Sequence, residues 1–154
     1  MLLPELRRTV AHLHLALPKN NLVAWTSGNL SARDPETGLV VIKPSGVPYE
    51  AMTAEQMVVT DLDGKVLHEA LRPSSDLPTH LALYQAFPAI AGVAHTHSKF
   101  ASSFAQARLE IPCLGTTHAD YFNGPVPVTA RLGRREIEQH YERNTGLAIV
   151  RRFA

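Results

Sequence analysis

Residues 90–98 read Ile90-Ala91-Gly92-Val93-Ala94-His95-Thr96-His97-Ser98, an apolar run that leads into two histidines. The run is typical of a β-strand, in which residues two apart point to the same face. His95 and His97 should therefore project side by side at the end of this strand. Two parallel neutral imidazoles are a favourable start for a transition-metal site. A single histidine in a chain with 8 of them is more often an exposed or hydrogen-bonded polar residue, so the hypothesis depends on the pair.

Composition indicates a folded globular domain rather than a nucleic-acid or membrane protein. The length of 154 residues predicts one domain over 1–154, and 45% hydrophobic with 19% charged residues is typical of a globular chain. A formal net charge of +1 without a Lys/Arg cluster argues against nucleic-acid binding. The single cysteine, Cys113, excludes an internal disulfide framework. The N-terminus has no long apolar core, which predicts no signal peptide and no membrane span, so the cytoplasm is the expected compartment.

Apolar spacing and turn residues predict a layered α/β domain. Helices are expected over 3–17 (ending at Pro18), 78–87, a segment after Ser98, and 136–144 with Gly146 near its C-cap. Extended segments or strands are expected over 22–32, 39–42, 57–62, 65–68, 90–94, 126–128 and 147–150. Hairpins early in the chain and helix–strand alternation later predict a mixed, largely antiparallel sheet flanked by helices.

Three short segments rich in serine and glycine could bind an anion such as phosphate. They are Gly28-Asn29, Ser45-Gly46 and Ser74-Ser75. The third precedes a predicted helix, whose first-turn amides and serine hydroxyls suit a phosphate group. Each pair alone is more often only a turn. Lys43 is either an additional cation in this site or a solvated lysine at a strand end.

Asp76 follows the two serines at the predicted helix start. If its carboxylate faces His95 and His97, the mixed oxygen and nitrogen donors fit Zn²⁺ or Mn²⁺ better than Ca²⁺. The alternative is that Asp76 caps the helix and has no ligand role.

Five ordered motifs together resemble the class II aldolase/L-ribulose-5-phosphate 4-epimerase family. They are Gly28-Asn29, Lys43-Pro44-Ser45-Gly46, Arg72-Pro73-Ser74-Ser75-Asp76, His95-Thr96-His97 and Thr116-Thr117-His118-Ala119-Asp120-Tyr121-Phe122. The resemblance extends from the first predicted helix to Phe153. It implies a class II aldolase-like fold, a divalent metal cofactor (Zn²⁺ or Mn²⁺), a small sugar-phosphate substrate and a homo-oligomer, a tetramer in this family.

The resemblance also implies a role for each matched residue. Asp76, His95 and His97 correspond to residues at the metal, Asp120 corresponds to a catalytic acid/base, and the substrate-binding positions are Gly28, Asn29, Ser45, Gly46, Ser74 and Ser75. Where the aldolases of this family have a glutamate beside the metal, this chain has Asp76. That difference and Asp120 favour the epimerase reaction: L-ribulose 5-phosphate becomes D-xylulose 5-phosphate by retro-aldol cleavage of C3–C4 and re-addition of the aldehyde on its other face.

The family pattern further places a third histidine ligand and a catalytic tyrosine beyond Ala154. The resemblance therefore implies a C-terminally shortened chain whose activity is impaired, and His118 is a weak substitute for the third ligand. Three alternatives stay open: a metal-dependent sugar-phosphate aldolase, a non-catalytic remnant of the epimerase, and a small metal-binding barrel. The predicted helices argue against the barrel.

Overall fold

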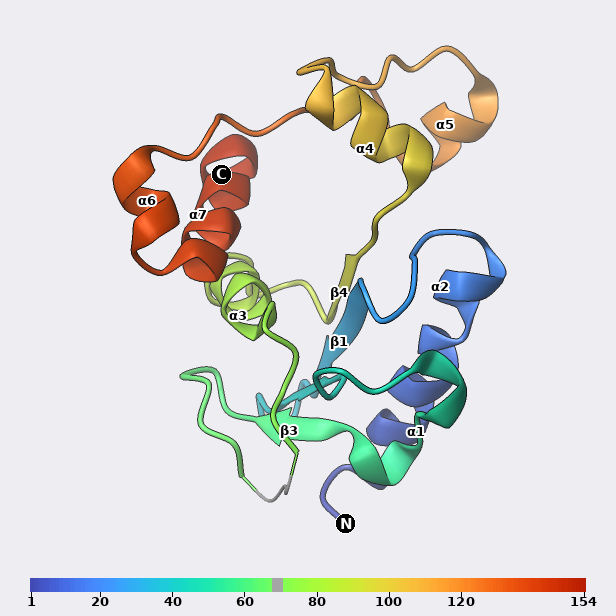
Figure 1. Ribbon diagram of the computed structural model, residues 1–154, viewed down its shortest axis with the longest axis vertical. Coiled ribbons are helices and arrows are strands. Elements are labelled where there is room, and N and C mark those ends of the chain that lie inside the picture. Colours follow the sequence, from blue (N-terminus) through green and yellow to red (C-terminus); the bar gives the residue numbers. More distant parts are fainter. Residues whose placement is uncertain (68–70) are drawn as a thin grey trace.

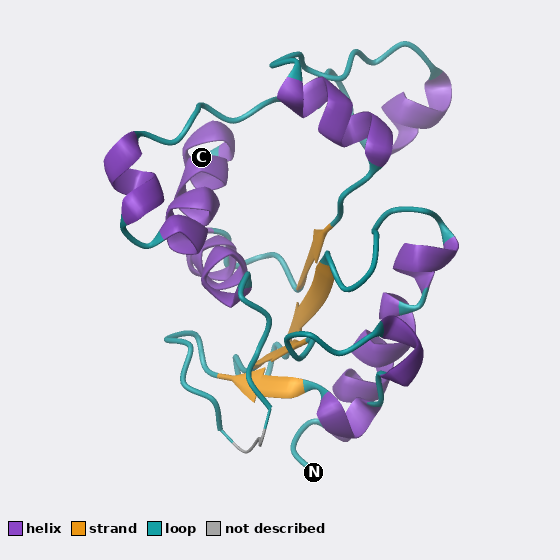
Figure 2. Ribbon diagram, in the orientation of Figure 1, coloured by secondary structure: helices purple, strands orange, loops and turns teal. Residues whose placement is uncertain are grey.

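The computed structural model describes residues 1–67 and 71–154, and in these ranges the strands form one small sheet between helices (Figures 1 and 2). The helices are α1 (Pro4–His14), α2 (Ala16–Lys19), α3 (Leu77–Ala86), α4 (Lys99–Gln106), α5 (Thr116–Tyr121), α6 (Arg134–Glu138) and α7 (Tyr141–Phe153). The strands are β1 (Asn29–Arg33), β2 (Val40–Ile42), β3 (Val58–Thr60) and β4 (Gly92–His95), and short 3-10 helices cover Tyr49–Ala51 and Ala54–Gln56. The predicted fold class, an α/β domain with a largely antiparallel sheet flanked by helices, is confirmed.

The sheet has the order β3-β2-β1-β4, and each neighbouring pair is antiparallel. On one side of β1, Ser31 lies opposite Ile42 of β2. On the other side, Asn29 lies opposite His95 of β4. This register brings the start of β1 next to the histidine end of β4, which is one of the two edge strands of the described sheet.

Each face of the sheet packs against a different helix. Strand residues alternate between the faces because successive side chains point in opposite directions. One cluster joins the sheet to α3 and contains Val40, Ile42, Val58, Leu77, Leu81 and Tyr84. The other joins the sheet to α1 and contains Val10, Val41, Met57 and Val59. The β-branched residues of β2 and β3 thus form the centre of a three-layer core.

Helix α7 packs against the outer side of α3 (Figure 1). Gly146 allows this contact, because a Cβ there would lie 2.8 Å from the Ala82 Cβ and 2.8 Å from the Thr79 carbonyl oxygen. The Thr79 hydroxyl also donates a hydrogen bond to the Glu142 carbonyl at 2.6 Å. The strand predicted over 147–150 is therefore wrong, and Gly146 lies inside a helix rather than at its C-cap. A short apolar run suits a buried strand or a buried helix face equally, and here packing on α3 selects the helix.

Other boundaries also differ from the predictions. Pro18 lies inside α2 instead of ending the first helix, since proline is tolerated in a first helical turn. In the 22–32 segment the strand ladder begins at Asn29, and the part before it makes one backbone hydrogen bond to β4's end, from the His97 N–H to the Leu22 carbonyl. The 65–68 and 126–128 strands are reduced to the isolated bridges Thr60–Val66 and Ile111–Val126, and residue 68 lies outside the described residues. The 136–144 helix divides into α6 and α7 at His140, whose φ is 58°.

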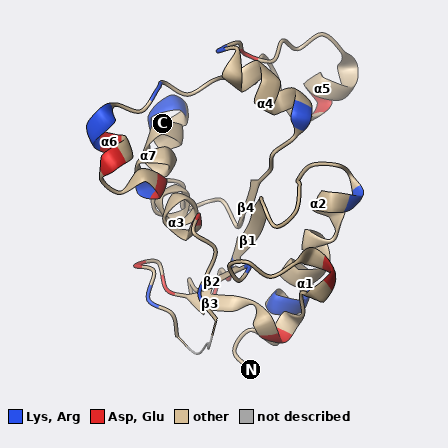
Figure 3. Cartoon of the chain, in the orientation of Figure 1, with Lys and Arg blue, Asp and Glu red and all other residues tan. Residues whose placement is uncertain are grey.

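The segment from α4 to α5 projects away from the sheet (Figure 1). Residues 98–140 contain no buried side chain, and Phe100, Leu114 and Tyr121 are exposed. Helices α6 and α7 carry charges of both signs (Figure 3), including an ion pair between Arg151 and Glu136 at 3.0 Å. None of the helices in the described ranges has the length and apolar character needed to cross a membrane.

Candidate active site

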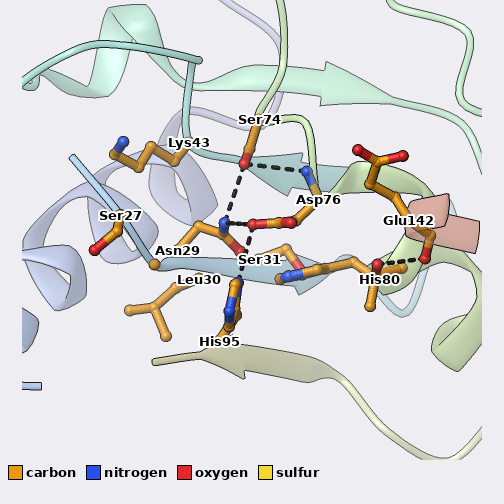
Figure 4. Close-up of polar contacts among 12 residues, drawn as sticks. Ser27, Asn29, Leu30, Ser31, Lys43, Ser74, Asp76, His80, His95 and Glu142 are labelled. Carbon is orange, nitrogen blue, oxygen red and sulfur yellow. Dashed lines mark hydrogen bonds and ion pairs between the residues drawn. The ribbon is translucent and has the colours of Figure 1, made fainter. Parts of the chain in front are cut away.

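Asp76 occupies the N-cap position of α3, but its carboxylate does not cap the helix. Oδ2 accepts a hydrogen bond from Asn29 Nδ2 at 2.6 Å and one from His95 Nδ1 at 2.9 Å (Figure 4). Pro78 in the first turn suits the helix start, since its missing N–H would have no helical partner there. The local sequence therefore starts the helix, and the side chain of Asp76 is directed toward β1 and β4.

Asn29 connects the carboxylate to the serine segment. Its Nδ2 also lies 3.0 Å from Ser74 Oγ, and the side chain is 2% exposed. Its Oδ1 is buried and has no hydrogen-bond partner among the described residues. A buried amide oxygen without a partner is costly, so the two contacts of Nδ2 with Ser74 and Asp76 must hold the side chain in this orientation.

His95 and His97 lie on the same side of the β4 end, as the H-x-H spacing predicted. Their ring centroids are 4.8 Å apart and the rings are tilted by 40°. The His95 and Asp76 side chains are 40% and 27% exposed, so a solvent ion can reach them. Among the described residues, however, no group of three His, Cys, Asp or Glu side chains has a metal-holding arrangement. Instead, the His95 imidazole is hydrogen-bonded directly to the Asp76 carboxylate through Nδ1.

The electrostatics favour an ionised carboxylate at the centre of the site. The hydrogen bond from His95 is the main reason that the pKa of Asp76 falls from 3.8 to about 2, with a further contribution from Asn29. Burial lowers the pKa of Lys43, and the charge of Asp76 opposes this effect. The carboxylate is therefore an anion over the whole physiological range and is suited to hold a cation.

One cavity of about 470 Å³ collects nearly all the predicted site residues. Its lining includes the predicted metal residues Asp76, His95 and His97 and the predicted substrate residues Gly28, Asn29, Ser45, Gly46, Ser74 and Ser75. Lys43 and Tyr141 also contribute to the wall. The serine and glycine segments come from separate loops, and the fold brings them together beside the imidazoles.

Gly28 is required where the loop enters β1. Its φ is +74°, and a Cβ would lie 2.4 Å from Val23 Cγ1 and 2.9 Å from the His95 carbonyl oxygen. Buried Tyr49 holds the same loop, because its hydroxyl donates to the Ser27 carbonyl at 2.7 Å and lies 3.0 Å from the Gly28 carbonyl. The backbone therefore reaches the cavity in a fixed conformation.

Sequence reasoning missed several residues that shape the site. Tyr141 reaches the cavity only because α7 packs on α3, and no local pattern indicates that contact. His80, one helical turn after Asp76, is fully buried on the sheet side of α3, with Nδ1 2.7 Å from Ser31 Oγ. His14 of α1 accepts a hydrogen bond from the Leu30 N–H through Nε2 at 2.9 Å. The i, i+4 spacing from Asp76 was a signal that could have identified His80.

Asp120 is the one predicted site residue outside the cavity. It lies on α5, which is exposed and projects with α4 away from the sheet (Figure 1). His118 of the same helix lies 2.9 Å from the Gly124 carbonyl through Nε2, so it does not serve as a ligand beside His95 here. The structure alone therefore does not bring Asp120 to the other site residues.

The fold and the H-x-H/acidic-residue cavity define a known class of domain. Residues 8–153 match the Class II Aldolase and Adducin N-terminal domain family, and the chain belongs to this family. It is 54% identical over 146 residues to the L-ribulose-5-phosphate 4-epimerase UlaF of Salmonella paratyphi C, covering 95% of this chain and 64% of that protein. The UlaF protein of Salmonella typhi gives the same identity and coverage.

Solved structures show the same fold. An L-fuculose 1-phosphate aldolase is 26% identical, with a TM-score of 0.79 over 93% of this chain and 68% of that one. The L-fuculose-1-phosphate aldolase of Thermus thermophilus is 22% identical, with a TM-score of 0.71 over 94% of this chain and 69% of that one. The predicted family resemblance is confirmed.

Proposed function

We propose that this chain carries the site of a metal-dependent L-ribulose-5-phosphate 4-epimerase. The observation that carries the proposal is the Asp76 carboxylate, which contacts Asn29 and His95 in a cavity lined by serines and glycines. The 54% identity to UlaF supports the epimerase among the reactions of the family. The chain covers 64% of the length of that relative, so the epimerase activity of the relative is proposed for this chain rather than inferred directly from the identity.

The donor atoms of three side chains are of the types that a divalent transition metal binds. Asp76, His95 and His97 offer one carboxylate and two imidazoles, and Zn²⁺ accepts this donor set. When bound, the ion supplies a Lewis acid at the ketose oxygens, where negative charge develops. The hydrogen bond from Asn29 Nδ2 would keep the Asp76 carboxylate oriented when such an ion is bound.

The remaining site residues bind the substrate and move protons. The serine hydroxyls of Ser45, Ser74 and Ser75 and the backbone amides of Gly46 and Ser75 would hold the phosphate of the ketose. Removal of the proton from the C4 hydroxyl allows the C3–C4 bond to break, which leaves an enediolate and a phosphorylated two-carbon aldehyde. Rotation of the aldehyde and re-formation of C3–C4 return the proton to the C4 oxygen with inverted configuration. Asp120 is proposed as the acid/base on one face.

A homo-oligomer, a tetramer by family resemblance, is part of the same proposal. The α4–α5 segment carries Asp120 and has exposed Phe100, Leu114 and Tyr121. Contiguous exposed apolar patches are typical of protein contacts, so we propose that these side chains belong to such a surface. Association of copies would cover them and would bring α5 to a cavity.

Zinc titration by calorimetry, with turnover of L-ribulose 5-phosphate followed by NMR, tests the proposal. We expect the chain to bind one Zn²⁺, and Asp76→Asn or His95→Gln to weaken binding at least about 10-fold. The exposed His12→Gln variant is the control and should bind like the unmodified chain. Absence of zinc binding, or equal affinity in all variants, would show that these side chains do not form a metal site.

A class II aldolase is the second candidate, because an L-fuculose 1-phosphate aldolase shares the fold at 26% identity. Release of free aldehyde without formation of an epimer would identify it. A zinc-binding failure together with no turnover would favour the non-catalytic remnant. The metal-binding barrel is wrong, since the described sheet is open and covered by helices.

A further inference from the structure

A second hollow adjoins the candidate active site. It has a volume of about 560 Å³ and is lined by Ser45, Leu71, Arg72, Pro73 and Ser75. Ser45 and Ser75 also line the main cavity, so the two hollows meet at two serines that the proposed function assigns to the phosphate. A group bound at these serines is therefore accessible from both sides.

Among the described residues that line the main cavity there is one lysine, Lys43, and its ammonium binds a loop carbonyl. Lys43 Nζ donates to the Thr26 carbonyl at 3.0 Å and lies 5.3 Å from the centre of the Tyr49 ring. The side chain is 3% exposed, and Figure 4 shows its ammonium near Ser27, on the side of Asn29 opposite Asp76.

A phosphate ester brings up to two negative charges next to the Asp76 carboxylate. Of the described residues that line the two hollows, Lys43 and Arg72 are the only lysine or arginine side chains. Arg72 is exposed, and no described carboxylate forms an ion pair with it. Its guanidinium is therefore an exposed cation beside the shared serines.

The backbone fixes Arg72 across from the loop that carries Ser45. The Ser45 N–H donates to the Arg72 carbonyl at 2.9 Å, and a β-bridge joins Pro44 and Pro73. The Ser74 N–H donates to the Lys43 carbonyl at 2.9 Å, which extends the same two-strand contact. The backbone of Arg72 is thus fixed beside the hollow, and its side chain extends from there.

We propose that Arg72 is a phosphate-recognition residue, whose guanidinium pairs with the substrate phosphate at Ser45 and Ser75 and selects phosphorylated sugars. The planar guanidinium forms two parallel hydrogen bonds to phosphate oxygens, which an ammonium does not. The inference rests on the proposed function, because it assumes that a sugar phosphate occupies the cavity. It adds a residue outside the serine and glycine motifs to the specificity of that site.

Titration of inorganic phosphate into the full chain, followed by backbone amide NMR at Gly46 and Ser75, tests this role. We expect Arg72→Gln to weaken phosphate binding at least about 10-fold, and Arg72→Lys to weaken it less. The exposed Arg131→Gln variant is the matched control and should bind phosphate like the unmodified chain. The salt dependence of binding should decrease in Arg72→Gln only.

A zinc titration on the same samples separates this inference from the proposed function. Zinc affinity should be equal in all four proteins, since Arg72 lies outside the metal side chains. Phosphate binding that is equal in Arg72→Gln and the unmodified chain would refute the role of Arg72 and leave the phosphate site standing. Absence of phosphate binding in the unmodified chain would refute both the phosphate site and the role of Arg72, whereas retained zinc binding would preserve the metal site.

Discussion

Two buried histidines should make the stability of this chain fall sharply in mild acid. His14 is 0% exposed, with Nδ1 donating to the Val10 carbonyl at 2.7 Å and Nε2 accepting from the Leu30 N–H. Protonation would place a second donor against that N–H. His80 is also 0% exposed, and its Nε2 has no hydrogen-bond partner among the described residues. Both rings are therefore suited only to the neutral form.

The size of the effect follows from the pKa shifts. Burial lowers the pKa of His14 and of His80 from 6.5 to about 4, with the Lys43 charge lowering the first further and the Asp76 charge opposing the second. Between pH 6.5 and 4 the unfolded chain binds more protons, so stability is fully present above pH 6.5 and is lost as the pH falls. At a pH of about 4.5 each histidine should remove about 2–3 kcal/mol. A domain with roughly 5–15 kcal/mol of stability would lose a large part of it.

Urea unfolding between about pH 7.5 and about pH 4.5, with a chelator present, measures this dependence. His14→Gln and His80→Gln should each be less stable than the unmodified chain at neutral pH but should lose less stability on acidification. Exposed His12→Gln should keep the full pH dependence. Asp76 does not confound the result. Its pKa falls from 3.8 to about 2 on folding, so the stability that its carboxylate contributes is lost at a lower pH than that of the histidines. An unchanged pH dependence in both buried variants would refute the reasoning.

Two further substitutions test the packing and the loop geometry, with urea unfolding at neutral pH as the measurement. Gly146→Ala should lower the free energy of unfolding by about 1–3 kcal/mol, because its Cβ would lie 2.8 Å from α3. Gly92→Ala, where the nearest atom is 3.7 Å away, is its control and should change stability by less than about 1 kcal/mol. Tyr49→Phe should cost about 1–2 kcal/mol, since the Ser27 carbonyl loses its donor. Equal stability of the two glycine variants, or an unaffected Tyr49→Phe chain, would contradict the respective contact.

The sequence by itself determined the features that depend on local backbone geometry. The β-branched residues of β2 and β3 predicted two strands, and the spacing of His95 and His97 placed them on one side of a third. The predicted site residues that line one cavity, all except Asp120, could be named beforehand because short motifs of serine, glycine and acidic residues are visible without any long-range contact. Their order along the chain was also enough to identify the family.

The tertiary structure alone decided how these elements face one another. The 147–150 run is a helix because Gly146 lets α7 approach α3, and that approach brings Tyr141 to the cavity. The sheet register places Asn29 of β1 and His95 of β4 where both contact the Asp76 carboxylate. The pairing of two loops forms the hollow beside Arg72. Periodicity specifies which side of an element a residue occupies, whereas only packing between distant segments determines which element it meets.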